Sequence, residues 1–397
     1  MPNIKDMYPY SGGFDLSIIN MSDDDPLLYE ITIPEIYMME SLLSPYLETT
    51  VMLQSPIHNV NTKNYDRFKF KTIRVSMNNP NINNGQSYEF QQIIYRMEKR
   101  KPLHEGNYSV EEFSLKSCDK TQISDLGTRV SKWWNCQTPT DVVDEALNCA
   151  GAINRDLEPS QPKRDYHAPN IHPFQVIAEQ ANVALNNNDP AFLHYMTYLN
   201  GGTHHFRSLN NLTKQSSKWT YVYSESGLGQ DLGNTQNILN YNFPCDFDGL
   251  TDILNGLDVN GNPSASLIAY NAFNGVASLV KGNLSSCGMS GALNRVVETT
   301  KYNNDGHCGS HIEDYGEVRK ARVSLIQQDK IMLNITVPFN PTLHVGDMID
   351  VYFPSKVSTD FNHGSGTYLI VNMMNNIKRG GYATSVLECV SQNVGNY

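Results

Sequence analysis

The segment GTYLIVNMMNNIKRGGYATSVLECVS, Gly366 to Ser391, decides the fold class of this chain. Apolar and polar side chains alternate through Thr367–Met374 and again through Ala383–Val390, and a basic, glycine-containing turn at Lys378–Gly381 separates the two runs. Alternation with a period of two lets a strand bury one face, so the segment predicts an antiparallel hairpin. The chain is therefore expected to be mainly β, of the α+β class.

The residues before this hairpin continue the pattern. Ile331–Val337 and Asp347–Phe353 also alternate, and a turn at Pro341–Gly346 lies between them. Short strands with turns at this spacing are typical of a small barrel or sandwich. The block from Arg319 to the end of the chain is accordingly predicted to be a β-barrel.

A second segment resembles the hairpin. FQQIIYRMEKRKPLHEGNYSVEEFSLKSC, ending at Cys118, also has an apolar strand that reaches a methionine, then a basic turn, a tyrosine and an alternating strand. Met97 and Tyr108 would correspond to Met373 and Tyr382. Such a repeat predicts two similar barrels in one chain. The alternative is that any two amphipathic hairpins look alike.

The first 118 residues carry further strand-like runs separated by turn clusters, which predicts an antiparallel barrel here too. One helical turn is expected at Ile36–Leu43, between Pro34 and Pro45. The expected strands are Leu27–Ile33, Glu48–Leu53, Phe68–Ser76, Phe90–Met97 and Glu111–Leu115.

The middle of the chain changes in texture and predicts helices. Thr138–Ala150 has an N-cap threonine followed by Pro139, and Pro173–Leu185 has apolar side chains at helical spacing. Arg155–Asn170 is expected to be a connector. Three strands are expected after it, at Phe192–Tyr198, His205–Leu209 and Trp219–Tyr223, with a hairpin turn at Asn200 and Gly201.

Ser224 to Asp314 is rich in Asn, Gly and Ser, which indicates long loops with short strands. The predicted organisation is a barrel over 1–118, an inserted α/β domain over 119–203 plus 226–315, and a second barrel over 204–225 plus 316–397.

Composition excludes several classes of protein. Among 397 residues, 30 Lys and Arg stand against 41 Asp and Glu, a net charge of -11, which disfavours a protein that grips nucleic acid. The first residues lack a secretory signal and no apolar run could cross a bilayer, so folding in a cytoplasm without membrane insertion is expected. The 7 cysteines form no CxxC pair and are interpreted as reduced thiols.

Two short motifs resemble metal sites without fitting one. His307, Cys308 and His311 could supply three zinc ligands, but the spacing is that of no known finger and a fourth ligand is missing. Asp258 begins a run like a calcium loop, but Pro263 stands where that loop requires glycine. No metal and no cofactor is therefore predicted.

Catalytic signatures are also weak. A glycosidase would need two positioned carboxylates, and the candidates lie in loop-like sequence where carboxylates are usually solvated. No nucleophile elbow, phosphate loop or dinucleotide fingerprint is present. Several aromatic residues could form a stacking surface, but core or subunit contacts are the favoured interpretation. The carboxylates are Asp246, Asp248, Asp252, Glu298, Asp305, Glu313 and Asp314, and the aromatics are Trp133, Trp134, Phe174, Phe192, Tyr195 and Tyr198.

Three stretches resemble one family. RKARVSLIQQDKIMLNITVPFNPTLHVGDMIDVYFPS, from Arg319, together with the hairpin that follows, resembles the closing barrel of baseplate hub proteins of contractile-tail bacteriophages, shared with type VI secretion spike proteins. HPFQVIAEQANVALNNNDPAFLHYMTYLNGGTHHFRSLNNLTKQ, from His172, and ISDLGTRVSKWWNCQTPTDVVDEAL, from Ile123, resemble other hub segments. Together they cover about the last two-thirds of the chain, and none is a catalytic signature.

The resemblance implies a structural protein without enzymatic activity. It implies a homotrimer of two barrels per chain, a pseudo-sixfold ring that joins the threefold central spike to the sixfold tail tube and leaves a channel for DNA during genome ejection. The implied partners are the spike, the tail tube or tube-initiator protein, baseplate wedge proteins and the tape-measure protein, with DNA only in transit. The implied location is the virion tail baseplate, after assembly in the host bacterial cytoplasm. The alternative is a carbohydrate-binding or cell-wall-degrading tail protein.

Overall fold

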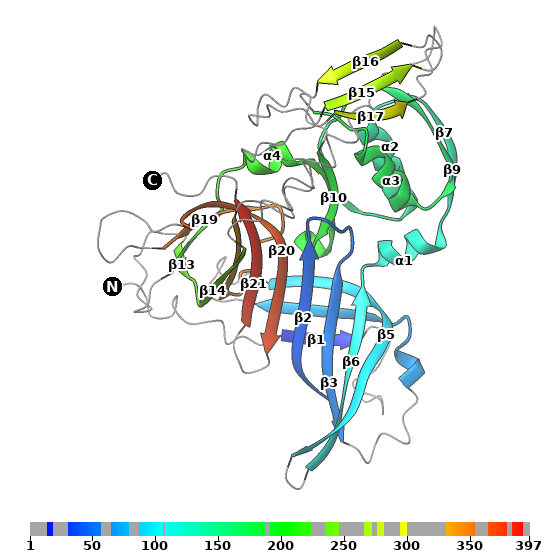
Figure 1. Cartoon of the computed structure of the whole chain (residues 1–397). Helices are drawn as coiled ribbons and strands as arrows, with labels where there is room; N and C mark the ends of the chain where they lie inside the picture. Colours follow the sequence, from blue (N-terminus) through cyan, green and yellow to red (C-terminus); the bar gives the residue numbers. More distant parts are fainter. Residues whose placement is uncertain are drawn as a thin grey trace.

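In a computed structural model of the chain, two linked β-sheet modules lie beside an α/β region (Figure 1). The residues that the structure describes are 14–18, 31–56, 65–78, 87–105, 108–186, 191–223, 235–245, 266–271, 276–281, 294–299, 331–353, 364–378 and 383–391. Strands dominate these residues, which confirms the mainly β class.

The first module is an antiparallel sheet in the order β4-β5-β6-β3-β2. A short strand, β1 (Phe14–Ile18), pairs with the outer edge of β4, and the 3-10 turn Tyr65–Phe68 precedes β4. The five strands are β2 (Thr32–Ser41), β3 (Glu48–Pro56), β4 (Thr72–Asn78), β5 (Ser87–Glu105) and β6 (Tyr108–Cys118).

The second module has the order β19-β20-β21-β18-β14. Two further strands extend it in parallel beyond β19, namely β12 (Trp219–Val222) and β13 (Thr235–Asn237). Its own five strands are β14 (Asn240–Cys245), β18 (Ile331–Pro338), β19 (Met348–Tyr352), β20 (Gly366–Lys378) and β21 (Ala383–Ser391).

The two modules have the same topology. In chain order, β2 to β6 of the first correspond to β14 and β18 to β21 of the second, and every neighbouring pair is antiparallel in both. The hairpins match at the methionines: Met97 lies opposite Leu115, and Met373 lies opposite Leu387. The predicted internal repeat is therefore confirmed.

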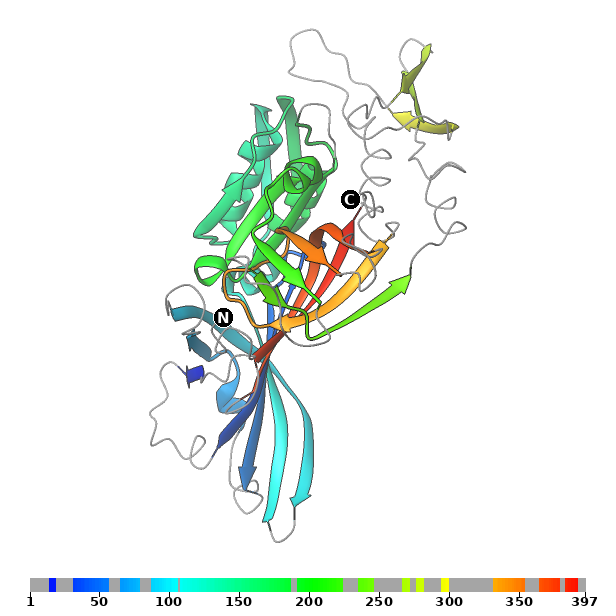
Figure 2. The same ribbon diagram turned by 90° about the vertical axis from the view of Figure 1, so that its left-hand side faces the viewer.

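Neither module closes into a barrel within the described residues. The edge strand β2 of the first module pairs with β20 of the second, so one 13-stranded sheet runs through both modules (Figure 2). Closure of each module into a barrel therefore stays a prediction. The modules are joined because β20 extends past β19 and the remaining edge of β20 pairs with β2.

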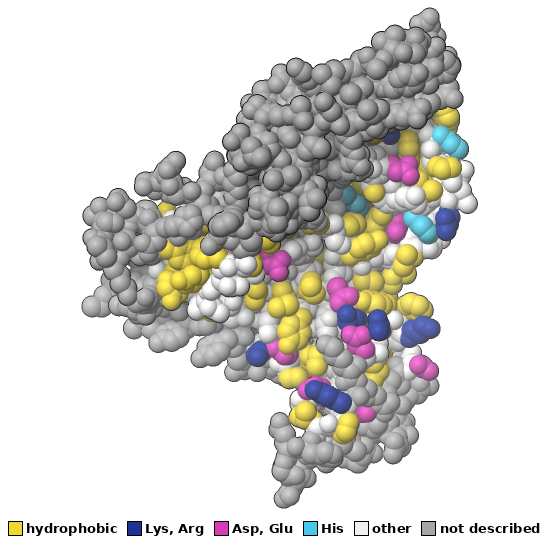
Figure 3. All heavy atoms as spheres, viewed as in Figure 1, with side chains coloured by type: hydrophobic (Ala, Val, Ile, Leu, Met, Phe, Trp, Pro, Cys, Tyr) yellow, Lys and Arg dark blue, Asp and Glu magenta, His cyan; other side chains and the backbone are white. Residues whose placement is uncertain are grey.

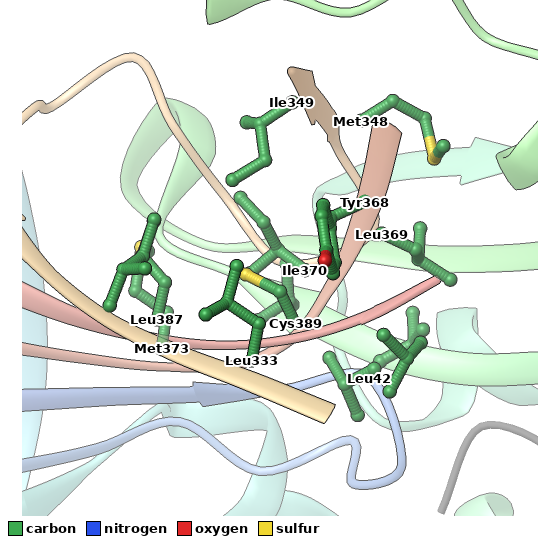
Figure 4. Packing of buried hydrophobic residues seen from close by; sticks show 14 of the residues in the cluster. Leu42, Leu333, Met348, Ile349, Tyr368, Leu369, Ile370, Met373, Leu387 and Cys389 are labelled. Carbon is green, nitrogen blue, oxygen red and sulfur yellow. The ribbon is translucent and has the colours of Figure 1, made fainter. Parts of the chain in front are cut away.

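Two hydrophobic clusters lie under this sheet. The first module buries Phe90, Phe113 and Met38 among others, and the second buries the residues shown in Figure 4. Leu42, which directly follows β2, packs in the second cluster with side chains of β18 to β21 (Figure 4). The joint between the modules is therefore covered by apolar packing as well as by strand pairing.

The helical turn expected at Ile36–Leu43 is wrong, because this segment belongs mostly to β2. Ile36, Met38 and Glu40 are all buried, with neighbours that are more exposed, which is the period of a strand. Pairing with β3 on one side and β20 on the other decides the conformation, whatever the two flanking prolines suggest locally.

The α/β region packs two helices against short strands. Helix α2 (Pro139–Cys149) confirms the predicted helix, and Thr138 caps it with Asp141 in a reciprocal capping box. Helix α3 (Pro173–Ala181) is shorter than expected. Their shared core is formed mainly by small and branched residues, including Val143, Ala146 and Ile177.

The strands of this region form two small sheets. β10 (Phe192–Thr197) and β11 (Thr203–Ser208) make the expected hairpin around Leu199–Gly201. The segment expected to be a connector contains two strands, β8 and β9, so that expectation is wrong. The remaining elements are α1 (Lys120–Gly127), β7 (Val130–Gln137), β8 (Asn154–Leu157), β9 (Arg164–Ile171) and α4 (Leu209–Thr213).

A separate three-stranded sheet is made by β15 (Ser266–Asn271), β16 (Val276–Lys281) and β17 (Asn294–Thr299). None of the described helices has the length and hydrophobicity needed to span a membrane. The domain boundaries given above remain a prediction, although β11 lies in the α/β region and β12 in the second module.

Cysteine chemistry differs from the expectation at one position. Cys118, Cys149 and Cys389 are free thiols, and burial raises the pKa of Cys118 to about 12. Cys136 is disulfide-bonded, so the interpretation of all cysteines as reduced is wrong there.

Candidate functional site

The joint between the modules is an antiparallel strand pair. β2 pairs with the second half of β20, from Glu35 opposite Lys378 to Ser41 opposite Asn372. The backbone continues the contact, because Leu42 N donates to Val371 O at 2.8 Å. Because the backbone pairs through seven successive positions, the modules are held in a fixed register.

The buried carboxylate of Glu40 links this joint to the rest of the chain by hydrogen bonds. The Glu40 side chain on β2 is only 1 % exposed. Its Oε1 accepts hydrogen bonds from the backbone N of Tyr198 at 2.8 Å and from His344 Nδ1 at 3.0 Å, and its Oε2 accepts one from Val345 N at 3.1 Å. Glu40 thus binds the first module, the α/β region and the second module at one point.

The sequence VGD at residues 345–347 provides the turn that receives Glu40. Gly346 has φ +85°, and a Cβ there would lie 2.8 Å from the Tyr195 hydroxyl, so only glycine fits. Asp347 Oδ2 accepts from His344 N at 2.9 Å, and its Oδ1 lies 2.7 Å from Lys218 Nζ. This part of the segment from Arg319, which resembles hub proteins, therefore forms a structural joint.

A row of histidines lies inside the α/β region, on β10 and β11. His194 Nε2 and His204 Nδ1 share a hydrogen bond of 3.1 Å, and His204 Nε2 is 3.0 Å from Thr121 Oγ1. Burial lowers the pKa of His204 to about 3, and burial together with the neighbouring histidines lowers that of His194 well below 6.5. These rings are held neutral at physiological pH.

The third histidine of the row has a carboxylate partner. His205 Nδ1 lies 3.0 Å from Asp156 Oδ2, and its Nε2 lies 2.9 Å from Thr197 Oγ1. The hydrogen bond from His205 lowers the pKa of Asp156, with Arg207 adding to the effect. The row is a satisfied polar network, and the described residues contain no group of three side chains arranged to hold a metal ion.

The motifs considered for metal or catalytic chemistry lie elsewhere. His307, Cys308 and His311 lie outside the described residues, as do the calcium-like run from Asp258 and six of the seven candidate carboxylates. The seventh, Glu298, is in β17, where only the backbone is described. The structure therefore brings none of them together in a described site.

The candidate aromatic surface is mostly core. Phe174, Phe192, Tyr195 and Tyr198 are all buried. Trp134 is also buried, stacks on Tyr166 and donates from Nε1 to Glu145 at 2.8 Å; among the tryptophan pair only Trp133 is exposed, at 60 %. The sequence-based preference for core contacts is confirmed for the five buried side chains.

The described surface carries both signs of charge. Figure 3 shows Lys and Arg side chains interspersed with Asp and Glu over the first module, with no continuous basic area among the coloured residues of this face. Several exposed pairs are salt-bridged, such as Arg74 with Glu89 and Lys101 with Glu112. The described part of this face therefore shows no basic patch of the kind that binds phosphates.

Comparisons with known proteins agree on the fold. No protein-family model and no curated protein sequence matches the chain. Among solved structures, the chain is similar to the 43 kDa tail protein of prophage MuSo2 from Shewanella oneidensis, with a TM-score of 0.57 and 13 % identity over 96 % of this chain and 97 % of that one.

Two further structures extend this likeness. The tail protein of Neisseria meningitidis MC58 matches with a TM-score of 0.56 and 11 % identity, covering 96 % of this chain and 97 % of that one. An E. coli component of the type VI secretion system, described as structurally similar to bacteriophage T4 tail proteins, matches with a TM-score of 0.52 and 8 % identity. This match covers 95 % of this chain and 76 % of that one. The chain therefore has the fold of phage tail proteins, as the resemblance to baseplate hub proteins implied.

Proposed function

We propose that this chain is the structural hub of a contractile phage tail baseplate. The observation that carries the proposal is the presence of two modules with one topology in a single chain. Three chains would then place six equivalent modules around an axis. Such a ring can meet a threefold spike on one side and a sixfold tail tube on the other, because its true symmetry is threefold and its module symmetry is sixfold.

The shared fold supports this proposal, because the similar structures include tail proteins and a component of the type VI secretion system. The partners we propose are the central spike, the tail tube or its initiator, wedge proteins and the tape-measure protein. DNA would pass through the central channel without being gripped, which fits the net charge of -11. The proposed location is the virion tail baseplate, after assembly in the host cytoplasm.

The proposed role needs no catalytic residue. Its mechanism is geometric. The pairing of β2 with β20 and the hydrogen bonds of the buried Glu40 side chain hold the two modules in the arrangement that this mechanism needs. No arrangement among the described side chains favours the alternative of a carbohydrate-directed enzyme.

Negative-stain images of the purified full chain test the module arrangement. Averaged end views are expected to show a ring with six lobes around a central opening, because both modules of each chain contribute a lobe. Rings with another number of lobes, or particles without an opening, would contradict the proposal. Hydrolysis of purified peptidoglycan by the same preparation would support the enzyme instead.

A further inference from the structure

The repeat identifies an edge of the first module that corresponds to an occupied edge of the second. In the second module, β19 pairs with β20 as far as Leu369, and the bonds Ile370 N to Asp347 O and Gly346 N to Ile370 O close that pairing. Beyond Ile370, the same edge of β20 is taken over by β2.

The first module repeats this arrangement up to that point. β4 pairs with β5 as far as Ile93, and the bonds Ile94 N to Lys71 O and Phe70 N to Ile94 O close the pairing. Ile94, Lys71 and Phe70 therefore correspond to Ile370, Asp347 and Gly346. Phe70, like Gly346, has a positive φ. Both long strands then carry a bulge against their hairpin partner directly afterwards.

Beyond Ile94 the two modules differ in the described neighbours of the long strand. β5 continues to Glu105, but on the side of β4 no described strand pairs with this second half. The equivalent half of β20 is fully paired with β2. The edge of β5 after Ile94, which we call the β5 edge, is therefore the place where the first module, among the described residues, has no counterpart to the pairing of β20 with β2.

The strand that would fill the β5 edge is identified by the same repeat. β14 occupies in the second module the position of β2 in the first, since β14 pairs with β18 as β2 pairs with β3. The other edge of β2 binds β20, whereas the other edge of β14 has no partner among the described strands. Tyr241 and Asn242 on β14 are exposed, Tyr241 at 39 %.

We infer that β14 of one copy of this chain pairs antiparallel with the β5 edge of the next copy. The contact would repeat between chains the pairing that β2 and β20 make within one chain. This inference rests on the proposed function, because it assigns the surface through which copies of the hub join. Figure 1 shows β14 to the left of β21 and β5 to the right of β6, so the two strands lie on different flanks of the linked sheet. A head-to-tail contact joins two such different surfaces.

The register of the contact follows from the repeat. Tyr37 lies opposite Asn376 in the pair of β2 and β20. On β14, Asn242 lies opposite Asn334 of β18, and on β2, Tyr37 lies opposite Thr50 of β3. Asn334 and Thr50 are matched positions of the two modules, so Asn242 corresponds to Tyr37. Lys101 corresponds to Asn376, because their partners Glu112 and Thr384 are matched positions of β6 and β21, although β5 has a second bulge between Glu98 and Lys101 that β20 lacks.

Asn242 of one copy should therefore lie opposite Lys101 of the next, and exposed Tyr241 should lie opposite Pro102. Before assembly, the exposed Lys101 side chain and the missing N–H groups of Pro102 and Pro244 would keep these edges from pairing nonspecifically.

Engineered cysteines test this register in the full chain. Residues directly opposite in an antiparallel pair have Cα atoms about 4.5–5.5 Å apart, which suits a disulfide. Oxidation of Asn242→Cys/Lys101→Cys is expected to shift most of the 44.7 kDa single-chain band on a non-reducing gel to covalent species of two and three chains. Wild-type protein, whose Cys149 thiol is exposed, gives the background.

Two controls make the result specific. A mixture of the single variants Asn242→Cys and Lys101→Cys is expected to give only two-chain species, which proves that the bond joins different chains. Asn242→Cys/Gln91→Cys is the matched negative control, because Gln91 is exposed on β5 but lies in the half already paired with β4. It is expected to remain at the wild-type background.

The outcome separates this inference from the proposed function. A trimer by native mass that gives no cross-link above the Gln91 control would overturn the β14 contact and leave the hub proposal standing. A chain that stays monomeric by native mass would overturn both. A cross-link that forms equally well with Gln91→Cys would also contradict the assigned register.

Discussion

Replacing Glu40 with alanine is expected to lower the free energy of unfolding by about 3–5 kcal/mol, the usual effect of removing one partner of a buried ionic network. The substitution leaves His344 and the backbone N–H groups of Tyr198 and Val345 without the carboxylate that binds them. Glu40→Gln should have a smaller effect, because one oxygen can still accept. Urea unfolding followed by tryptophan fluorescence measures both variants.

Glu89→Ala is the matched control for Glu40. Glu89 also lies in the linked sheet and also pairs with a cation, Arg74, but both side chains are about half exposed, at 50 % and 48 %. Exposed pairs of this kind contribute about 0–1 kcal/mol, so Glu89→Ala should be close to wild type. Equal effects of Glu40→Ala and Glu89→Ala would refute the fastening role.

Acid is expected to destabilise the α/β region through His204. The unfolded chain binds a proton at this residue near the ordinary pKa of about 6.5, whereas the folded chain does so only near 3. The unfolded state therefore holds more protons between these values, and stability falls as pH falls. The loss is roughly 2 kcal/mol from pH 7 to pH 5 and roughly 4 kcal/mol by pH 3.

The main physical cause is burial, which lowers the pKa of His204, and the charges of His205 and Arg155 lower it further. His204 also shares a hydrogen bond with His194. If His204 took up a proton, both of its ring nitrogens would be donors, and the added charge would lie near Arg155, whose own charge lowers the pKa of His204. Unfolding free energies at pH 7, 6 and 5 should decline less steeply in His204→Gln than in wild type. His167→Gln, at an exposed position of β9, should keep the wild-type slope. An unchanged slope in His204→Gln would contradict the assignment.

The sequence predicted the parts of the fold that depend on local pattern. The hairpin of β20 and β21 and the capping box of α2 need only alternation, a turn and an N-cap threonine. The repeat was also visible, because Met97 and Met373 reach the same place in equivalent strands.

The rest depends on distant partners. Ile36–Leu43 lies between Pro34 and Pro45 and resembled a helical turn, but pairing with β3 on one side and with the distant β20 on the other makes most of it a strand. β7 and β9 are interrupted by register shifts and include Pro169, so neither alternates regularly. Glu40 forms hydrogen bonds with Tyr198 and His344, which are 158 and 304 residues away in the sequence, and no local sequence pattern predicts such contacts.

The native mass of the purified full chain, by light scattering during gel filtration over a range of concentrations, tests the central claim most directly. The hub account predicts a stable trimer, three times the chain's 44.7 kDa, or about 134 kDa. A mass of 44.7 kDa at every concentration, unchanged by addition of the candidate spike protein, would contradict it.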